Sequence, residues 1–262
     1  MSVENENTAS QPYGTAILKA AKILEYLSTE PNGQGTSEIA RQTQMNKSTV
    51  FKLLETLQLI GFIEKSPDNS HNKIGLGLAK FAHAYLQQTD IVRIAKPILE
   101  VLNTETGETV HLGVLDNLSI VYVLKLESKQ PVRLYSKVGI AAPLYCTGIG
   151  KAALSTFNNK ELDSYIEKTE LQKHTGHTIV DSEKLREEME KIRCLGYAVD
   201  NSEHEEDVRC VAIPLFTRSK LLGAISISSP RYRMDDEKLE KYVQFLRDAA
   251  HTIIGQLQVL LS

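Results

Sequence analysis

Apolar residues in the first part of the chain recur every three to four positions, the spacing of helices that bury one face. Over residues 15–29 this spacing predicts an amphipathic helix, which the turn Pro31-Asn32-Gly33 ends. Its apolar stripe consists of Ala16, Ile17, Ala20, Ile23, Leu24 and Leu27.

Two shorter helices follow at the spacing of a helix-turn-helix. Thr36 and Ser37 are expected to cap the first of them. A tight break over residues 42–45 precedes the second, which runs over residues 47–59 behind the capping residue Asn46. The residues expected to face the core are Ile39 and Ala40 in the first helix, and Val50, Leu53, Leu54 and Leu57 in the second.

A polar turn after these helices favours a β-wing. Gly61 ends the second helix, and short segments at residues 62–64 and 73–74 flank the polar turn at residues 66–72, which gives a hairpin of wing length. Near its start the second helix keeps hydroxyls, ammonium groups and one aromatic ring off its core side. A recognition helix presents this region to phosphates and base edges in the major groove. The sequence therefore predicts binding to double-stranded operator DNA through Thr36, Ser37, Lys47, Ser48, Thr49, Phe51 and Lys52.

Two alternatives accompany this interpretation. Any small three-helix domain has capped helices with apolar stripes, and an aromatic residue next to Val50, such as Phe51, is more often a packing residue than a base contact.

Residues 76–88 are predicted to form a further helix with its own apolar side. That side suits contact with another chain or with the first helix, and packing on its own domain is an equally good interpretation.

From residue 91 onward the pattern changes to mixed helices and strands. Helices are predicted at residues 91–104, 150–157, 160–168, 182–194 and 235 to about 260. Strands are predicted at residues 110–115, 120–126, 132–138, 197–200, 208–215 and 221–228. This order predicts an antiparallel sheet with helices around it, in a chain of the α+β class.

Length and composition suit an intracellular protein of two domains. The chain has 262 residues, its hydrophobic content of 42% can fill two cores, and no apolar run approaches membrane-spanning length. The polar leader, residues 1–12, does not resemble a signal peptide and is expected to be disordered. Three cysteines without a CxxC pair indicate a reducing compartment, so a cytoplasmic location without a membrane partner is expected.

The net charge of −3 gives no overall attraction to nucleic acid, but the charge is unevenly distributed. Residues 11–88 carry eight Lys and Arg against six Asp and Glu, a net of +2, and the remaining residues sum to −5. DNA affinity is therefore expected to come from a local basic face and from the avidity of a dimer.

The segment Gly148-Ile149-Gly150-Lys151 invites comparison with a phosphate-binding loop, but the comparison fails. A P-loop requires a glycine five residues before Gly150 and a Ser or Thr after the lysine, where this chain has Tyr145 and Ala152. A glycine-containing turn at a helix start remains, and its free amides can hold a small anion such as a carboxylate. An ordinary junction between loop and helix is an equally good interpretation.

The sequence predicts no catalytic site, no metal site and no cofactor. There is no GxSxG motif, and neither Cys146 nor Cys210 lies in a protease-like context. Ligand spacing typical of zinc motifs is absent, so surface or loop positions are the favoured interpretation of the histidines. A metal site assembled in space stays open for His111, His174, His177 and His204.

Small polar residues gather near the last predicted strands. An acidic loop at residues 203–207 is interpreted as solvated, with Asp200 before it and Cys210 after it at strand ends where a pocket can open. Ser226 and Ser228 share one face of their strand because successive side chains alternate. Two small hydroxyls on an otherwise apolar face suit a small polar ligand.

Over residues 15–260 the sequence resembles the IclR family of transcriptional regulators. The N-terminal resemblance comprises LKAAKILEYL, SEIARQTQMNKSTVFKLLETLQLIGFIEK and IGLGLAKFA, in the order and spacing of the family's winged helix. The C-terminal resemblance, to its effector-binding domain, comprises VGIAAPLYCTGIGKAAL, LREEMEKIRCLGYAVDNSEHEEDVRCVAIPLF and AISISSPRYRM. One departure is Phe51-Lys52, where many members carry His or Tyr followed by Arg, a change expected to alter operator preference and to leave the fold intact.

The resemblance implies a winged helix-turn-helix domain at residues 13–75, a linker helix at 76–90 and a GAF-like α/β effector-binding domain at 91–262. It also implies a homodimer, often a homotetramer, and a small carboxylate or sugar acid as effector. The implied pocket residues are Leu134, Ala142, Gly148, Ile149, Asp200, Cys210, Ser226 and Ser228. Leu134 and Ala142 would be apolar walls, the amides near Gly148 and Ile149 would take the carboxylate, and Asp200 with the serines would take hydroxyl or carbonyl groups.

The favoured function is therefore a ligand-responsive transcriptional regulator, a repressor of a carbon-catabolic operon that binds an inverted-repeat operator. An activator of the same family is the alternative. An enzyme acting on a small acid is disfavoured because no paired base and nucleophile are visible. The sequence leaves open the effector, the operator with its target genes, and the choice between dimer and tetramer.

Overall fold

The computed structural model describes residues 14–88, 90–131, 134–217 and 220–261, so the predicted disordered leader lies outside the described residues. The chain divides between Tyr85 and Leu86 into two compact units. Within the described residues, no helix has the length and apolar character needed to cross a membrane.

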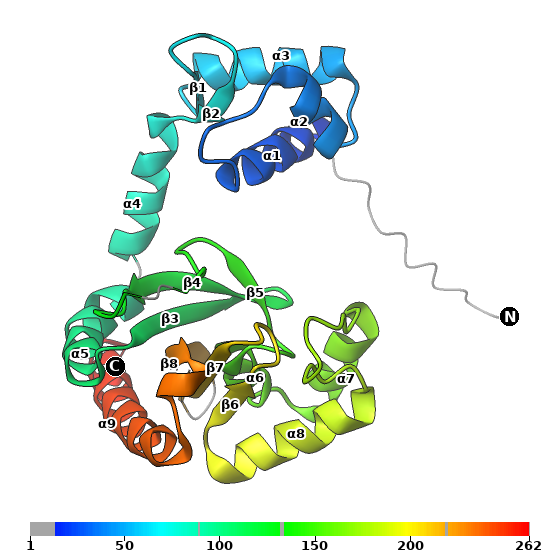
Figure 1. Ribbon diagram of the computed structural model, residues 1–262. Helices are drawn as coiled ribbons and strands as arrows, with labels where there is room; N and C mark the ends of the chain where they lie inside the picture. The colour runs from blue at the N-terminus through cyan, green and yellow to red at the C-terminus, as the bar shows by residue number, and fades with distance from the viewer. Residues whose placement is uncertain (1–13, 89, 132–133, 218–219, 262) are drawn as a thin grey trace, which may run out of the picture. The chain divides into compact units, whose positions relative to one another are not determined.

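The first unit consists of helices around one apolar core and a two-stranded wing (Figure 1). Its helices are α1 (Thr15–Ser28), α2 (Thr36–Gln42), α3 (Lys47–Leu59), the 3₁₀ turn η1 (Leu76–Leu78) and the greater part of α4 (Ala79–Gln88), within which the boundary between the units falls. Strand β1 (Ile63–Lys65) pairs antiparallel with β2 (Asn72–Ile74). The core consists of Ile23, Leu27, Ile39, Ala40, Val50, Leu54, Leu57 and Ile63. The predicted helix-turn-helix and the predicted hairpin are confirmed.

The predicted helix caps need correction. Gly35, and neither Thr36 nor Ser37, occupies the N-cap position of α2, and no side chain accepts a hydrogen bond there. Asn46 does occupy the N-cap position of α3, but its side chain accepts none of the first-turn amides. The N-cap side chains therefore satisfy no amide at the start of either helix, although the Glu38 and Thr49 amides donate to the carbonyl oxygens of Gly35 and Asn46 at 3.0 and 2.9 Å.

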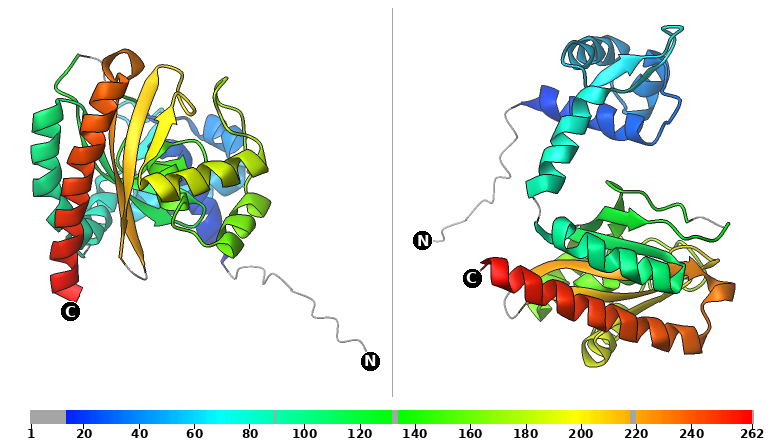
Figure 2. Two further views of the ribbon diagram at one scale, coloured as in Figure 1. Left: turned by 90° about the horizontal axis from the view of Figure 1, so that it is seen from below. Right: turned by 90° about the vertical axis from the view of Figure 1, so that its left-hand side faces the viewer.

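The second unit is a six-stranded antiparallel sheet with helices on both faces, which confirms the predicted α+β class (Figures 1 and 2). The strand order is β5 (Ala141–Pro143), β4 (Ser119–Leu126), β3 (Thr109–Asp116), β8 (Leu221–Pro230), β7 (Val208–Phe216), β6 (Ala198–Asn201). Helices α5 (Asp90–Thr106) and α9 (Asp236–Leu261) lie side by side on one face. The other face carries α6 (Gly148–Leu154), α7 (Asn159–Lys168) and α8 (Ser182–Leu195), and the 3₁₀ turn η2 (Arg231–Arg233) follows β8.

The strand predicted at residues 132–138 is wrong over its described part, residues 134–138, which form no strand. Residues 132 and 133 lie outside the described residues. The carbonyl oxygens of Leu134 and Ser136 instead accept hydrogen bonds from Lys125 Nζ at 2.9 and 2.6 Å. The edge strand is β5, in which Ala142 lies opposite Ile120.

The alternation of side chains along the strands decides which residues face α6. Every second residue of β3, β7 and β8 belongs to the core beneath α5 and α9: Val110, Leu112, Val211, Ile213, Ile225 and Ile227. Their neighbours therefore face α6: His111, Cys210, Ala212, Ser226 and Ser228. The polar residues of the sheet are thereby gathered on the face opposite α5 and α9.

Helix α6 begins at Gly148, two residues earlier than predicted, because the Thr147 hydroxyl accepts a hydrogen bond from the Gly150 amide at 3.1 Å. A Cβ atom on Gly150 would lie 2.5 Å from the Pro143 carbonyl oxygen and 2.6 Å from Leu144 Cα. Both are backbone atoms, which cannot rotate away. The helix can pack this closely only with glycine at this position.

Gly150→Ala is therefore expected to lower the free energy of unfolding by about 1–3 kcal/mol, the cost of overpacking a filled core. Urea denaturation of the full chain measures this change. The control is Gly176→Ala, because no atom lies within 4 Å of a Cβ added there. Equal stability of the two variants would contradict the close approach.

Candidate functional site

The start of α3 presents an exposed polar face in the first unit. Lys47, Ser48 and Lys52 are exposed, Thr49 is half-buried, and the Phe51 side chain is 54% exposed. Phe51 is thus not a core residue, and the packing interpretation of that position is wrong. The helical spacing that buries the apolar residues of α3 leaves this basic and hydroxyl-rich face outward.

Two neighbouring elements complete the polar surface of the first unit. Thr36 is half-buried and Ser37 is exposed at the start of α2. In the wing, the Asp68 carboxylate accepts hydrogen bonds from the hydroxyls of Ser66 at 2.5 Å and Ser70 at 2.7 Å, and these bonds hold the pKa of Asp68 well below its usual range. The tip of the wing is therefore an ordered turn with a permanent negative charge.

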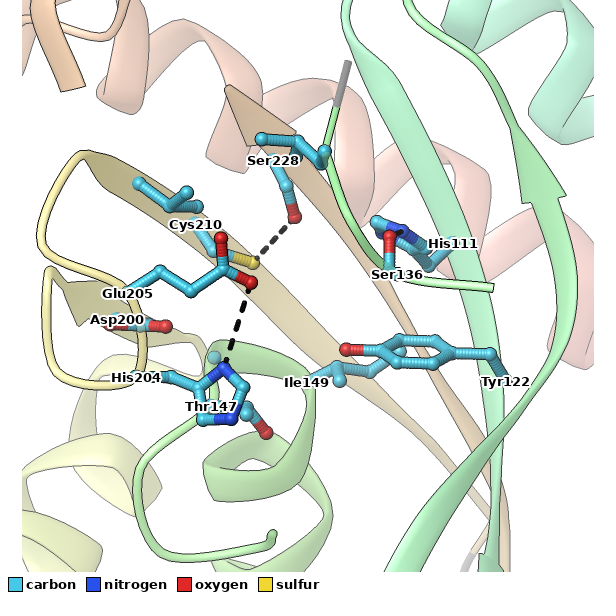
Figure 3. Close-up of a pocket in the computed structure, with 13 residues that line it drawn as sticks. His111, Tyr122, Ser136, Thr147, Ile149, Asp200, His204, Glu205, Cys210 and Ser228 are labelled. Carbon is cyan, nitrogen blue, oxygen red and sulfur yellow. Dashed lines mark hydrogen bonds and ion pairs between the residues drawn. The ribbon is translucent and has the colours of Figure 1, made fainter. Parts of the chain in front are cut away.

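In the second unit a cavity lies between α6 and the sheet (Figure 3). Six of the eight residues predicted for effector binding line it: Leu134, Gly148, Ile149, Asp200, Cys210 and Ser228. Its volume is about 40 Å³. A cavity of this size has room for about two or three waters, so a metabolite requires the lining to move apart.

The other two predicted residues do not line this cavity. Ala142 is buried within β5 and packs in the core on the α6 side of the sheet. Ser226 is buried behind the lining, with its hydroxyl oxygen 3.4 Å from His111 Nδ1. Ser226 is therefore connected to the cavity through His111 and through Cys210, with which it also forms a side-chain hydrogen bond.

Sequence reasoning missed seven residues of the lining: His111, Tyr122, Ser136, Thr147, His204, Glu205 and Val208. Their proximity depends on strand register. Asp200 lies opposite Cys210, and Cys210 lies opposite Ser228, so these three side chains form one row across β6, β7 and β8. The one signal in the sequence was His111, a polar residue within an otherwise apolar alternating strand.

Burial shifts the pKa values of two lining groups into opposite directions. It raises the pKa of Asp200 to about 7, an effect that the hydrogen bond from the Glu203 amide, 2.7 Å long, partly offsets. It lowers the pKa of His111 to about 3, helped by the nearby charge of Lys125. The His111 ring is therefore neutral, and Asp200 is divided between acid and carboxylate near neutral pH.

The Cys210 thiol occupies the centre of the row. Burial raises its pKa to about 12, and the Ser228 hydroxyl donates to its sulfur at 3.0 Å. A Cβ on Gly148 would lie 2.9 Å from this sulfur, so the glycine allows the first residues of α6 to approach the row. The thiol is uncharged and serves as a weakly polar wall of the cavity.

Three charged residues, of which Lys151 and Glu203 are buried, connect three elements of the second unit. Lys151 of α6 is fully buried, and its ammonium group contacts Glu188 of α8 at 2.9 Å and Glu203 of the β6–β7 loop at 2.5 Å. Burial lowers the pKa of Lys151, but the two carboxylates outweigh it and the net direction is upward. We refer to these residues as the Lys151 triad.

The loop between β6 and β7 is only partly solvated, in contrast to its interpretation from sequence. Glu203 is buried in the Lys151 triad, whereas Glu206 and Asp207 are exposed. The next two residues, His204 and Glu205, line the cavity, and the Glu205 carboxylate points into it (Figure 3). His204 Nδ1 lies 3.9 Å from this carboxylate.

The histidines have partners that the sequence did not reveal. His174 and His177 both lie in a loop, as predicted, and both are exposed. The His174 ring lies 5.0 Å from the ring of His204, and one ligand atom from each of these two rings lies within 4.8 Å of the Cys146 sulfur. Among the described residues, Cys146, His174 and His204 thus form a group whose ligand atoms could hold a metal ion.

Comparison with known proteins gives matches over nearly the whole chain. Residues 16–67 match the model of the IclR helix-turn-helix domain, and residues 83–254 match the model of the bacterial transcriptional regulator IclR C-terminal region. The HTH-type transcriptional regulator KdgR of Escherichia coli (strain K12) is 35% identical over 244 residues, which cover 93% of this chain and 92% of KdgR.

Two further comparisons extend the match. The HTH-type transcriptional repressor AllR of the same strain is 32% identical over 245 residues, covering 93% of this chain and 90% of AllR. A crystal structure of an IclR homolog from Microbacterium hydrocarbonoxydans, complexed with 4-hydroxybenzoate, superposes with a TM-score of 0.80 at 20% identity. The superposition covers 93% of this chain and 99% of the homolog, and it shows a shared fold.

Proposed function

This chain belongs to the IclR family of bacterial transcriptional regulators, and from that premise we propose that it represses a carbon-catabolic operon under the control of a small carboxylate metabolite. The first unit binds double-stranded operator DNA through α3, with Thr36 and Ser37 of α2 at its side. The second unit binds the metabolite between α6 and the sheet and thereby changes operator affinity.

One observation carries this proposal. A single chain joins a helix with an exposed basic start to a second unit with a buried polar cavity. The names of the relatives support the assignment, because AllR is a repressor and the structural homolog holds 4-hydroxybenzoate, a carboxylate. In this chain the neutral His111, the hydroxyls of Ser136 and Ser228 and the amides near Gly148 supply hydrogen-bonding partners for such a ligand.

Exposed apolar side chains of the first unit support a homodimer. Ile17, Leu59 and Leu76 are 75%, 86% and 83% exposed, and Phe81 is 52% exposed while its ring edge contacts Phe62. Large apolar side chains gathered on one small unit favour a protein interface. A two-fold dimer requires an inverted-repeat operator whose half-sites are about one helical turn apart, or a multiple of it.

The test is a mobility-shift assay with DNA from the region upstream of the neighbouring operon, in the presence of a panel of keto acids and sugar acids. We expect one retarded complex, which dissociates in the presence of at least one acid. A DNase footprint of the same DNA should cover two symmetric half-sites. A footprint over one asymmetric half-site would contradict the dimer, and turnover of any acid would favour an enzyme.

Ser228→Ala is expected to weaken binding of the responding acid by about five- to 150-fold. The reason is that a ligand group left without its partner costs about 1–3 kcal/mol in a buried site. Isothermal titration calorimetry measures this affinity, and operator binding without the acid should be unchanged. The matched control is Ser229→Ala, a buried serine on the other face of β8. Equal acid affinity in the two variants would remove Ser228 from the site.

A further inference from the structure

The two sides of the cavity differ in charge. Asp200 and Glu205 lie on the side of β6 and the β6–β7 loop, whereas His111 and Ser136 lie on the opposite side (Figure 3). The His111 ring is neutral, and the described lining residues include neither a lysine nor an arginine. A carboxylate that enters beside Asp200 and Glu205 is repelled, so it needs a cation close to the other side of the cavity.

Lys125 of β4 is a cation that the strand register places beside this other side. It lies opposite His111 in the pairing of β4 with β3, and residues directly opposite each other in an antiparallel pair share one face of the sheet. The Lys125 side chain is only 7% exposed. Burial lowers the pKa of His111 and the charge of Lys125 lowers it further, whereas burial raises the pKa of Glu205 and the same charge opposes that rise. The field of Lys125 therefore reaches both sides of the cavity.

The ammonium group of Lys125 is bound by the lining of the cavity itself. Its Nζ donates to the carbonyl oxygens of Leu134 at 2.9 Å and Ser136 at 2.6 Å, and both of these residues line the cavity. The Ser136 hydroxyl also lies 2.7 Å from His111 Nε2. The third contact of Nζ is an ion pair at 3.0 Å with Glu127, whose side chain is 48% exposed and therefore screened by water. The lining thus holds this charge through two neutral oxygens.

Residues 134–136 are the least firmly held part of the described lining. Backbone hydrogen bonds hold the strands and α6, and the hydroxyls of Thr175 and Thr178 donate to carbonyl oxygens of the β6–β7 loop. Within the described ranges, no backbone hydrogen bond holds residues 134–136. Tyr135 is 80% exposed, so carbonyl oxygens that are released in this segment can be solvated. Enlargement of the cavity from about 40 Å³ therefore begins with the release of Lys125 from this segment.

We propose that Lys125 binds the carboxylate of the effector and thereby selects acids over neutral compounds, an inference that rests on the proposed function. The carboxylate replaces the carbonyl oxygens of Leu134 and Ser136 on Nζ, and residues 134–136 move outward as the cavity enlarges. Two opposite charges attract more strongly than a charge attracts a neutral oxygen, and burial strengthens this attraction. The exchange of partners on Nζ therefore favours an acid over a neutral compound of the same shape.

This assignment sets the orientation of the effector. Its carboxylate points toward β4, and its hydroxyl or carbonyl groups point toward Asp200, Cys210 and Ser228. The family resemblance implies the reverse, with the carboxylate at the amides near Gly148. That position lies beside Asp200, because a Cβ on Gly148 would be 3.4 Å from the Asp200 amide nitrogen. Helix α6 has only seven residues, so few peptide dipoles add up at its start, and its amides suit an uncharged oxygen of the effector.

The test is a nuclear magnetic resonance titration of the full-length protein labelled with ¹³C-lysine. The Cε signal of Lys125 is assigned from its absence in Lys125→Arg. The probes are acetate, pyruvate and 4-hydroxybenzoate, monocarboxylates of increasing size, and each is paired with its primary amide at constant ionic strength. We expect at least one acid to shift the Lys125 signal with saturation, at a lower concentration than its amide. If none of the three acids does so, the proposal is overturned.

Variants separate the charge of Lys125 from its hold on residues 134–136. Lys125→Met keeps the stem and removes the ammonium group, so the ratio of acid affinity to amide affinity should fall at least about tenfold, the lower end of what close charge pairs contribute to binding. A residue that merely held the segment would change both affinities alike, and Lys125→Arg should keep the ratio. The matched control is Lys137→Met, which removes an exposed ammonium group next to the segment. Equal ratios in Lys125→Met and Lys137→Met would refute the proposal.

Mobility shifts of operator DNA with the same acids keep the two proposals apart. Lys125 lies in the second unit and α3 in the first, so the two measurements report on separate events. An acid that shifts the Lys125 signal with saturation but leaves the operator complex intact would refute the regulator and leave the Lys125 contact standing. An acid that dissociates the operator complexes of the wild type and of Lys125→Met at the same concentration would do the reverse.

Discussion

Lys151→Met is expected to lower the free energy of unfolding by about 3–5 kcal/mol, the usual cost of removing one partner from a buried ion pair. Methionine fills much of the space of the lysine stem, so the loss is one of charge. Glu203, 6% exposed, is left buried without a cation, and one of its carboxylate oxygens already has no hydrogen-bond partner among the described residues. Urea denaturation of the full chain at neutral pH measures the effect.

The pH dependence of this variant has a definite sign. Burial already raises the pKa of Glu203 in the folded protein, and removing Lys151 raises it further. Between the pKa of Glu203 in the unfolded chain and its higher pKa in the folded protein, the native state binds more protons than the unfolded state. The free energy of unfolding therefore increases as the pH falls through that interval. The deficit of Lys151→Met should therefore shrink in mild acid. Glu203→Gln in the same chain should recover part of it at neutral pH.

The control for the triad is Lys184→Met, which removes an exposed lysine of α8. We expect a change of no more than about 0.5 kcal/mol, as for most surface positions. If Lys151→Met and Lys184→Met were equally stable, Lys151 would contribute nothing through its charge, and the β6–β7 loop would have to be held by other contacts.

In the double variant Lys47→Ala/Lys52→Ala, the loss of Lys52 alone is expected to weaken operator binding by about 2–6 kcal/mol per dimer. A base-reading side chain contributes about 1–3 kcal/mol, and a symmetric dimer presents each residue twice. Lys47, at the first position of α3, is expected to contact phosphate, so its loss should also reduce the salt slope by about one per contact. Mobility shifts at several salt concentrations measure both quantities.

Lys160→Ala/Lys168→Ala matches this variant in charge and exposure but lies in α7 of the second unit. It should leave operator affinity and salt slope unchanged, which separates a local contact from an effect of net charge. Thermal unfolding of all variants should coincide with that of the wild type. Native operator affinity in the double variant would exclude the start of α3 from the DNA interface.

Local periodicity predicted most of the fold because burial of one face leaves a repeating signal. The stripes of α1, α3 and α9 and the alternation in β7 and β8 each arise within one segment. The segment at residues 132–138 shows the same alternation, but the described part of it bonds to Lys125 through its carbonyl oxygens and forms no strand. The Lys125 side chain belongs to β4, so the pattern within residues 132–138 carries no sign of these hydrogen bonds.

The site was predicted where residues close in sequence are also close in space, as at Gly148 and Ile149. His111, Tyr122 and His204 were missed because their proximity comes from register between distant strands and from one loop. The pairing of His174 with His204 has the same origin. Their separation along the chain gives no ligand motif, and only the fold brings their rings to 5.0 Å.

Because β8 pairs with β3, the sheet of the second unit can form completely only after the chain has been synthesised through β8. His111 and Ser226 face each other across these strands at a separation of 115 residues. While a ribosome is still adding residues between them, the first unit is already complete and can fold, because chains fold from the N-terminal domain onward. The part that reads DNA thus matures before the part that senses the metabolite. A chain whose synthesis stops before β8 would lack the response to the metabolite, and it would bind the operator at every metabolite concentration.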